Sequence, residues 1–164
     1  MAEIQNVQGL AQLSALLKTL PAHLAKKHLR AAVAEGAKLV RNDARTRAPV
    51  SSGAKAKGAP SSGTLKKSIV MKSIPEKSHL ERQTFYVTVR RGKKFQRVTR
   101  RKKGQSTTVN LDAFYWRFVE FGTKFITAQP FMRPAFEMQK KAAVDAIAAR
   151  LKSGIAQSVS ELKR

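Results

Sequence analysis

Residues Tyr115–Glu137 read YWRFVEFGTKFITAQPFMRPAFE, and this stretch decides how the chain folds. It holds the only tryptophan of the chain and five of its eight phenylalanines. Aromatic side chains bury a large apolar area per residue, so a cluster of this density anchors a core or an interface. A glycine commonly ends a helix, and a proline commonly opens one in its first turn. Gly122 and Pro134 therefore predict a short helix, an extended crossing segment and a long terminal helix.

Two helical patterns precede this stretch. The first runs from Leu10 to Leu20. The second opens at Pro21 and ends near Ala48, because Pro49 disfavours helical geometry in the residue before it. Small residues on one side of this second helix allow close packing: Ala25, Leu29, Ala32, Val33, Gly36, Val40 and Ala44. We interpret its basic residues as a solvated outer face: Lys26, Lys27, Arg30, Lys38, Arg41, Arg45 and Arg47.

The middle of the chain contains patterns typical of strands. Alternation of apolar and polar residues predicts strands over Lys67–Ile74 and Thr84–Arg91. A third strand, Lys94–Arg100, is expected to pair with the second across the short turn Gly92-Lys93. Ser106–Asn110 is a candidate fourth strand of the same sheet.

These elements predict an α+β fold. A long N-terminal helix and a long C-terminal helix, which starts at Pro134, are expected to pack on a small antiparallel sheet of three to four strands. We predict a single domain over residues 1–164, with a flexible loop at 49–63 and a basic hairpin at 90–104. The loop is predicted from its Pro, Gly and Ser content and its lack of periodicity.

The net charge of the chain is +23, from 33 Lys and Arg against 10 Asp and Glu. A charge of this size raises the local concentration of anions and predicts a polyanionic or acidic partner. The excess is densest at these nine residues of the predicted hairpin: Arg90, Arg91, Lys93, Lys94, Arg97, Arg100, Arg101, Lys102 and Lys103. We expect them to contact nucleic-acid phosphates or an acidic protein, and phosphate contacts carry no sequence readout.

Several classes of chemistry are disfavoured by the composition. The absence of cysteine excludes disulfides, thiol chemistry and cysteine-based zinc sites. His23, His28 and His79 lack metal-binding spacing and are expected to be exposed, so we predict no metal and no cofactor. No apolar run approaches the roughly 20 residues of a membrane span, so we expect a soluble protein made in a cytoplasm without a membrane partner.

Glu120 lies among aromatic residues, where an unpaired charge is costly. We expect a structural role, either an ion pair with Arg117 or Arg133 or hydrogen bonds to backbone amides. A catalytic carboxylate is the less favoured alternative, and no acid–base pair is evident in the sequence. We therefore predict that the protein is not an enzyme.

Several motifs occur in a fixed order: Ala48-Pro49, Gly63-Thr64-Leu65-Lys66-Lys67-Ser68-Ile69, Val119-Glu120-Phe121-Gly122-Thr123, Gln129-Pro130-Phe131 and Arg133-Pro134-Ala135. This pattern resembles the neck protein family of long-tailed bacteriophages, a gene-product-ten-like group of tail components. The chain departs from the family pattern by the insertion Val50–Ser62 and by its very basic segment.

The resemblance implies a structural virion protein of the head–tail junction, which forms a ring around the DNA channel and joins the capsid connector to the tail. The implied partners are further copies of the chain, head-closure or connector proteins, tail-terminator or tail-tube proteins, and the phosphates of the genomic DNA. The implied location is the virion, after assembly in the host cytoplasm. We expect the hinge to supply the interface through Tyr115, Trp116, Phe118, Glu120, Phe121, Gly122, Thr123, Pro130, Phe131, Arg133 and Pro134.

One alternative is a small basic cytoplasmic nucleic-acid-binding protein that uses residues 90–103 as a phosphate clamp. A basic nuclease or toxin is the weakest hypothesis, because the sequence shows no plausible base or metal cluster.

Overall fold

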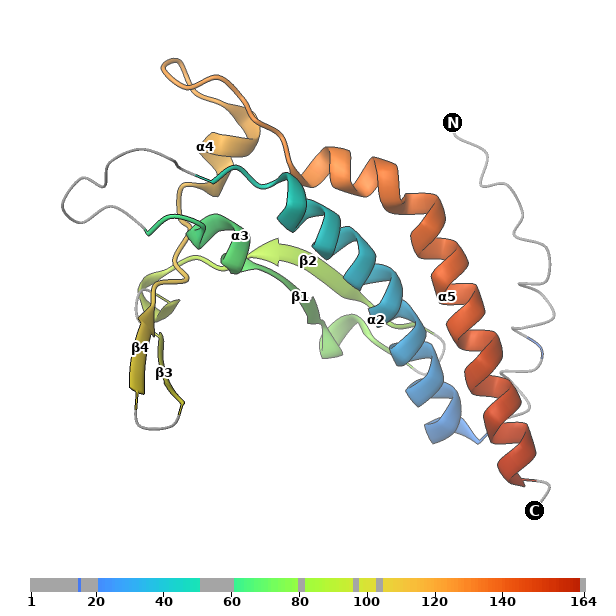
Figure 1. Ribbon diagram of the computed structural model, residues 1–164. Coiled ribbons are helices and arrows are strands. Elements are labelled where there is room, and N and C mark those ends of the chain that lie inside the picture. The colour runs from blue at the N-terminus through green and yellow to red at the C-terminus, as the bar shows by residue number, and fades with distance from the viewer. Residues whose placement is uncertain are drawn as a thin grey trace. The chain divides into compact units, whose positions relative to one another are not determined.

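The computed structural model describes residues 15, 21–50, 61–79, 82–95, 98–102 and 105–162 (Figure 1). The chain divides into two compact units, and each is described by itself. The terminal unit comprises Met1–Lys38, Ser73–Tyr86 and Lys141–Arg164, and the hinge unit comprises Leu39–Lys72 and Val87–Lys140. Two long helices, α2 (Ala22–Arg47) and α5 (Met132–Leu162), contribute to both units. The single-domain assignment stays a prediction.

The long helices confirm the predicted α+β class. α2 follows Pro21, whose carbonyl accepts the N–H of Leu24 at 2.9 Å. α5 begins two residues before the predicted start, at Met132, so that Pro134 lies in its first turn, where the missing N–H costs no helical hydrogen bond. The predicted helix from Leu10 to Leu20 lies almost entirely outside the described residues, as do residues 51–60 of the predicted loop. In the part of the chain that is described, no helix is long and apolar enough to cross a bilayer.

The core of the hinge unit brings the aromatic stretch against α2 and β1. Its buried members are Ala44, Ala48, Leu65, Ile69, Val89, Ala113, Phe131 and Ala135. Phe131 is the largest fully buried side chain in the described residues, with no exposed surface. Tyr115, Trp116 and Val119 pack against this core from the region of α4 (Trp116–Phe121). Burial of the Tyr115 ring raises the pKa of its hydroxyl. A fully buried Phe contributes about 1.5–3 kcal/mol to folding, so the hinge stabilises this unit directly.

A short helix, α3 (Thr64–Ser68), occupies part of the predicted first strand. Gly63 has φ of +74°, and its carbonyl accepts the N–H of Lys67 at 3.0 Å, which closes the first turn. Thr64, Leu65 and Ser68 are buried, so the segment packs as a helical turn before β1 (Ile69–Ser73) begins. The prediction of a strand from Lys67 was therefore wrong at its start.

Two separate two-stranded sheets replace the single predicted sheet. β1 pairs with β2 (Phe85–Val89), and hydrogen bonds at opposite ends, Ile74 N–H to Thr84 O and Arg90 N–H to Ser68 O, make the pair antiparallel. β3 (Val98–Lys102) pairs antiparallel with β4 (Gln105–Val109). The prediction of one sheet of three to four strands was therefore wrong in its strand count.

The chain after β2 explains this difference. A 3₁₀ turn, η2 (Lys93–Phe95), follows Gly92 in place of a two-residue hairpin turn. The N–H of Phe95 donates to the carbonyl of Gly92 at 2.9 Å, and Gly92 has φ of +109°. The carbonyls of Arg90 and Phe95 then accept the N–H groups of Ala113 and Leu111, which return from β4. Lys94–Arg100 therefore does not pair with β2 as predicted.

In the terminal unit, small residues of α2 pack against α5. Ala25 and Ala32 form a buried cluster with Leu151 and Ile155. A Cβ on Gly36 would lie 2.7 Å from Ile147 Cδ1 and 3.0 Å from the carbonyl oxygen of Ala143, so glycine favours this close approach. The stripe of small residues predicted on α2 is confirmed at these positions.

Candidate interaction surfaces

Glu120 caps the N-terminus of α5 from the end of α4. Its Oε2 accepts the backbone N–H groups of Phe131 at 2.8 Å and Met132 at 3.0 Å, and its Oε1 accepts that of Arg133 at 3.1 Å. The first N–H groups of a helix lack intrahelical acceptors, and an anion there also interacts favourably with the helix dipole. Because Glu120 is only 3 % exposed, these bonds form away from water. The carboxylate thus fixes the start of α5 relative to α4.

The two basic residues proposed as ion-pair partners of Glu120 lie over aromatic rings instead. The guanidinium of Arg133 is 4.9 Å from the centre of the Phe121 ring, and that of Arg117 is 5.6 Å from the Trp116 ring. None of the three ion pairs between described residues includes Glu120. Of the two structural alternatives, the amide-binding one holds and the ion pair with Arg117 or Arg133 does not.

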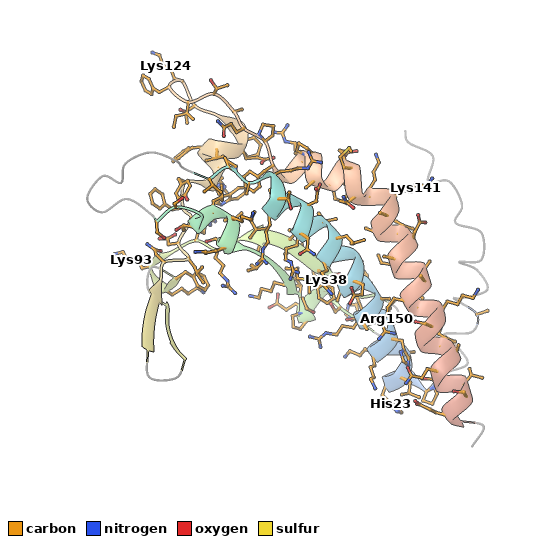
Figure 2. The ribbon with its side chains drawn as sticks, in the orientation of Figure 1. His23, Lys38, Lys93, Lys124, Lys141 and Arg150 are labelled. Atoms are coloured by element: carbon orange, nitrogen blue, oxygen red, sulfur yellow. The ribbon has the colours of Figure 1, made fainter. Side chains whose placement is uncertain are left out.

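The segment that joins α4 to α5, residues 122–131, forms an ordered loop that we call the hinge loop. Gly122 ends α4 with φ of +74°, and a Cβ there would lie 2.9 Å from the backbone of Ile126 and Ala128. Thr123 and Ile126 pair as an isolated antiparallel bridge, and the Thr123 hydroxyl accepts the N–H of Phe125 at 3.2 Å. Figure 2 shows Lys124 near the end of the loop that projects away from α4. These contacts order the backbone that carries the apical side chains.

Large apolar side chains on and around the hinge loop are exposed. Phe125 is 89 % exposed and Ile126 is 53 % exposed. Seven of the ten large hydrophobic residues that are exposed in the described structure belong to residues 114–138, and together we call them the hinge apolar surface: Phe114, Phe118, Phe121, Phe125, Ile126, Phe136 and Met138. Concentrated exposed apolar surface typically marks a site of interaction with another protein.

One comparison with known proteins identifies the family of the chain. The sequence profile described as "Bacteriophage HK97-gp10, putative tail-component" matches residues 11–122. The chain belongs to this HK97-gp10-like family. As a family member the protein is a bacteriophage tail component and a virion protein that interacts with other virion proteins. No curated protein and no solved structure gave a match.

The family match includes some of the elements described above and leaves others outside. It includes α2, both small sheets and α4, and it ends at Gly122. The exposed tip of the hinge loop, with Phe125 and Ile126, and the whole of α5 follow that residue. The interface residues that we predicted upstream of Thr123 are inside the match, whereas the other five are beyond it: Thr123, Pro130, Phe131, Arg133 and Pro134.

The predicted interface residues have two different environments. Phe131 and Glu120 are buried, and Tyr115, Trp116, Gly122 and Pro134 are partly buried. The exposed members are Phe118, Phe121, Thr123, Pro130 and Arg133. The buried members build the hinge, and the exposed ones are available to a partner. The sequence analysis missed Phe125 and Ile126, although both stand in the quoted stretch, because sequence alone does not reveal which aromatic side chains remain in water.

The basic residues at 90–103 are divided between two local structures. Arg91, Lys93 and Lys94 are exposed at and beside η2. The side chains of Arg90 and Lys94 lie 5.7 and 5.1 Å from the centre of the Phe95 ring. Arg100, Arg101 and Lys102 belong to β3, and Arg97 and Lys103 lie outside the described residues. The single basic hairpin predicted at 90–104 was therefore wrong in its bounds, because the hairpin is β3–β4 and the first basic residues precede it.

Two further predictions for α2 were wrong. His28 was expected to be exposed, but it is buried and its Nε2 lies 2.6 Å from Ser158 Oγ. Burial and neighbouring cations lower the pKa of His28. Arg45 was placed on the solvated face, but its Nε and Nη2 donate to the carbonyl of Ile69 at 2.9 and 2.7 Å. Burial lowers the pKa of Arg45. His23 and His79 are exposed, and the described residues contain no group of three His, Asp or Glu that could hold a metal.

Proposed function

We propose that the protein is a structural, non-enzymatic component of the head–tail junction, which forms a ring between the capsid connector and the tail and surrounds the DNA channel. In this proposal the hinge apolar surface is the principal contact with neighbouring subunits. The observation that carries the proposal is an exposed apolar surface, beside a loop that backbone hydrogen bonds order, on a member of a phage tail-component family. The protein acts by positioning its neighbours.

The geometry of the hinge suits a subunit contact. The Glu120 cap, Gly122 and the Thr123 bridge order the loop before any partner is present. A preordered contact surface loses less conformational entropy on binding than a mobile one, so more of the contact energy appears as affinity. Closed rings require two different, complementary surfaces on every subunit. The hinge apolar surface supplies one of these two surfaces.

Charge supports an acidic neighbour or DNA close to the protein. Between residues 114 and 138 the charged residues are Arg117, Glu120, Lys124, Arg133 and Glu137. Glu120 is buried in the helix cap and Glu137 pairs with Lys140, so the remaining exposed charges of this region are positive. A ring of subunits that each carry a net charge of +23 also requires negative charge close to it. Acidic virion proteins or the phosphates of packaged DNA would supply this charge.

The alternative function is a nucleic-acid-binding protein that uses the basic residues at 90–103 as a phosphate clamp. The exposed cations at Arg91, Lys93 and Lys94 are compatible with phosphate contact. Assembly state distinguishes the two functions, because a phosphate clamp needs no ring and no exposed aromatic surface.

Complementation of particles that lack this protein tests the proposal. Without the protein we expect filled heads and finished tails that do not join. The double variant Phe125→Ser/Ile126→Ser should reproduce this failure, since it removes the apical apolar groups and leaves the buried core unchanged. Normal, infectious particles in its complete absence would refute the proposal.

A matched control separates an interface effect from reduced solubility or folding. Val50 and Val144 are exposed apolar residues outside the hinge apolar surface. The double variant Val50→Ser/Val144→Ser should join heads and tails normally. Equal failure of both double variants, at equal thermal stability, would remove the special role of the hinge loop.

A further inference from the structure

An open hollow of about 580 Å³ lies in the terminal unit, on the first turns of α2. Its lining combines basic, small and aromatic side chains: His23, Lys26, Lys27, Arg30, Ala31, Ala34 and Phe85. Figure 2 shows His23 at the N-terminal end of α2. Small-molecule and peptide sites typically have volumes of roughly 300–1,000 Å³, so the hollow is large enough for a ligand of several side chains.

The positive charges of the hollow are not compensated within the helix. Residues three and four positions apart are neighbours on a helix surface. The first carboxylate of α2 is Glu35, so none is available at these spacings to Lys26, Lys27 or Arg30. The ion pairs found between described residues involve other lysines and arginines. Positive charges close to a helix N-terminus also oppose the helix dipole.

The apolar part of the lining distinguishes this hollow from an ordinary basic surface. Phe85 comes from β2 and is only partly buried, and Ala31 and Ala34 line the same hollow. An occupant with an apolar side chain would remove this surface from water, which contributes about 25 cal/mol per Å². The same occupant would need negative groups to face the three cationic side chains.

We propose that this hollow is a docking site for an acidic segment of another protein that carries an apolar side chain between carboxylates. The apolar side chain lies against Phe85 and the alanines, and the carboxylates pair with Lys26, Lys27 and Arg30. The site is separate from the hinge apolar surface and lies in a different unit of the chain.

A second copy of the chain is a poor occupant. Its ten carboxylates are widely spaced, and the two closest in sequence, Glu76 and Glu81, are five positions apart. No stretch of the chain therefore places carboxylates on both sides of an apolar residue within one helical turn. Duplex DNA is also disfavoured, because the phosphate backbone offers no apolar group to the alanine and phenylalanine surface.

Fluorescence anisotropy with defined probes tests the site. The probes are a labelled peptide of glutamates around one leucine, a labelled polyglutamate peptide of equal charge, and a labelled random-sequence DNA duplex. The wild-type protein should bind the leucine peptide more tightly than polyglutamate. Lys26→Glu/Arg30→Glu should weaken binding of the leucine peptide by about tenfold or more, because each reversal replaces an attraction with a repulsion between like charges.

Two controls make the test specific. Lys141→Glu/Lys152→Glu reverses two exposed lysines of α5 outside the hollow, so it produces the same change in net charge. This control variant should weaken binding of the leucine peptide by less than about threefold, because distant surface charges are screened by salt. Ala34→Gln, which fills the hollow without altering charge, should weaken the leucine peptide and leave polyglutamate and DNA binding unchanged.

Either of two results would overturn the proposal. One is an equal decrease of affinity for the leucine peptide in the two charge-reversed variants. This result would show that the peptide responds only to the net charge of the protein. The other is a protein that binds the DNA duplex more tightly than the leucine peptide and whose affinity for that peptide does not change in Ala34→Gln. This result would indicate a phosphate-binding site. Because the assay involves neither ring formation nor head–tail joining, its outcome is independent of the proposed function.

Discussion

Replacing Glu120 with alanine removes the acceptor of three backbone N–H groups at the start of α5. Hydrogen bonds to charged groups contribute about 1.5–3 kcal/mol each. The N–H of Phe131 is buried, whereas those of Met132 and Arg133 are partly accessible to water, so the three contributions should not add fully. We expect the free energy of unfolding to fall by about 3–5 kcal/mol, most of it from the buried N–H left without an acceptor.

Two comparison variants calibrate this value. In Glu120→Gln one oxygen can still accept from Phe131 and Met132, but the amide NH₂ faces the N–H of Arg133, so we expect a decrease of about 1–2 kcal/mol. Glu137→Ala removes an exposed ion pair with Lys140 and should change the free energy by less than about 1 kcal/mol.

The assay is urea unfolding followed by tryptophan fluorescence and far-UV circular dichroism. Trp116 is the only tryptophan and packs against the core of the hinge unit, so its emission reports on this region. The reasoning is refuted if Glu120→Ala unfolds at the same urea concentration as Glu137→Ala. A decrease in Glu120→Gln as large as that in Glu120→Ala would show that the carboxylate charge, and not the number of acceptors, determines the effect.

Three other predictions concern pH, the hinge loop and DNA. Burial, and to a lesser extent nearby cations, lowers the pKa of His28 below 6.5 in the folded protein. The unfolded chain therefore binds a proton at His28 more tightly than the folded protein does. The stability that His28 contributes should be full above pH 6.5 and should decline as the pH falls below 6.5. Thermal unfolding as a function of pH tests this, and a His28→Asn variant should lose that part of the pH dependence. Gly122→Ala places a Cβ 2.9 Å from the Ala128 nitrogen, at a residue whose φ is +74°. Thermal unfolding should therefore show a destabilisation of about 1–3 kcal/mol. An unchanged melting temperature would contradict the assigned loop geometry. The third variant neutralises the three exposed cations of residues 91–94. In a plot of log affinity for duplex DNA against log salt concentration, the slope should become shallower by about 0.9 for each phosphate that the protein no longer contacts. An unaltered slope would exclude phosphate binding at these residues.

The helices could be predicted from the sequence because local signals determine their ends. Pro21 precedes α2, Gly122 ends α4, and Pro134 stands in the first turn of α5. These residues act through their own backbone geometry, which does not depend on the rest of the fold. For the same reason the order of short helix, crossing segment and long helix could be predicted from the aromatic stretch alone.

The strand pairing could not be predicted in the same way. An alternating pattern indicates a strand but does not specify its partner. The 3₁₀ turn after Gly92 directs the chain away from β2, and the N–H groups of Leu111 and Ala113 use the carbonyls of Phe95 and Arg90. These are contacts between distant positions, and no short-range motif encodes them.

The burial of His28 had a signal that the sequence analysis overlooked. His28 is spaced three residues from Ala25 and four from Ala32, so it belongs to the buried stripe of small residues on α2. Gly154 on α5 makes room for its ring, since a Cβ there would lie 2.5 Å from Nδ1. The helical spacing of His28 within this stripe was therefore a signal of its burial.

Electron microscopy of the head–tail junction in purified particles tests the central claim most directly. We expect a closed ring of this chain around the DNA channel, with the hinge loop and Phe125 at the contact between neighbouring subunits. A junction that lacks the chain, or a ring in which Phe125 faces open solvent, would contradict it.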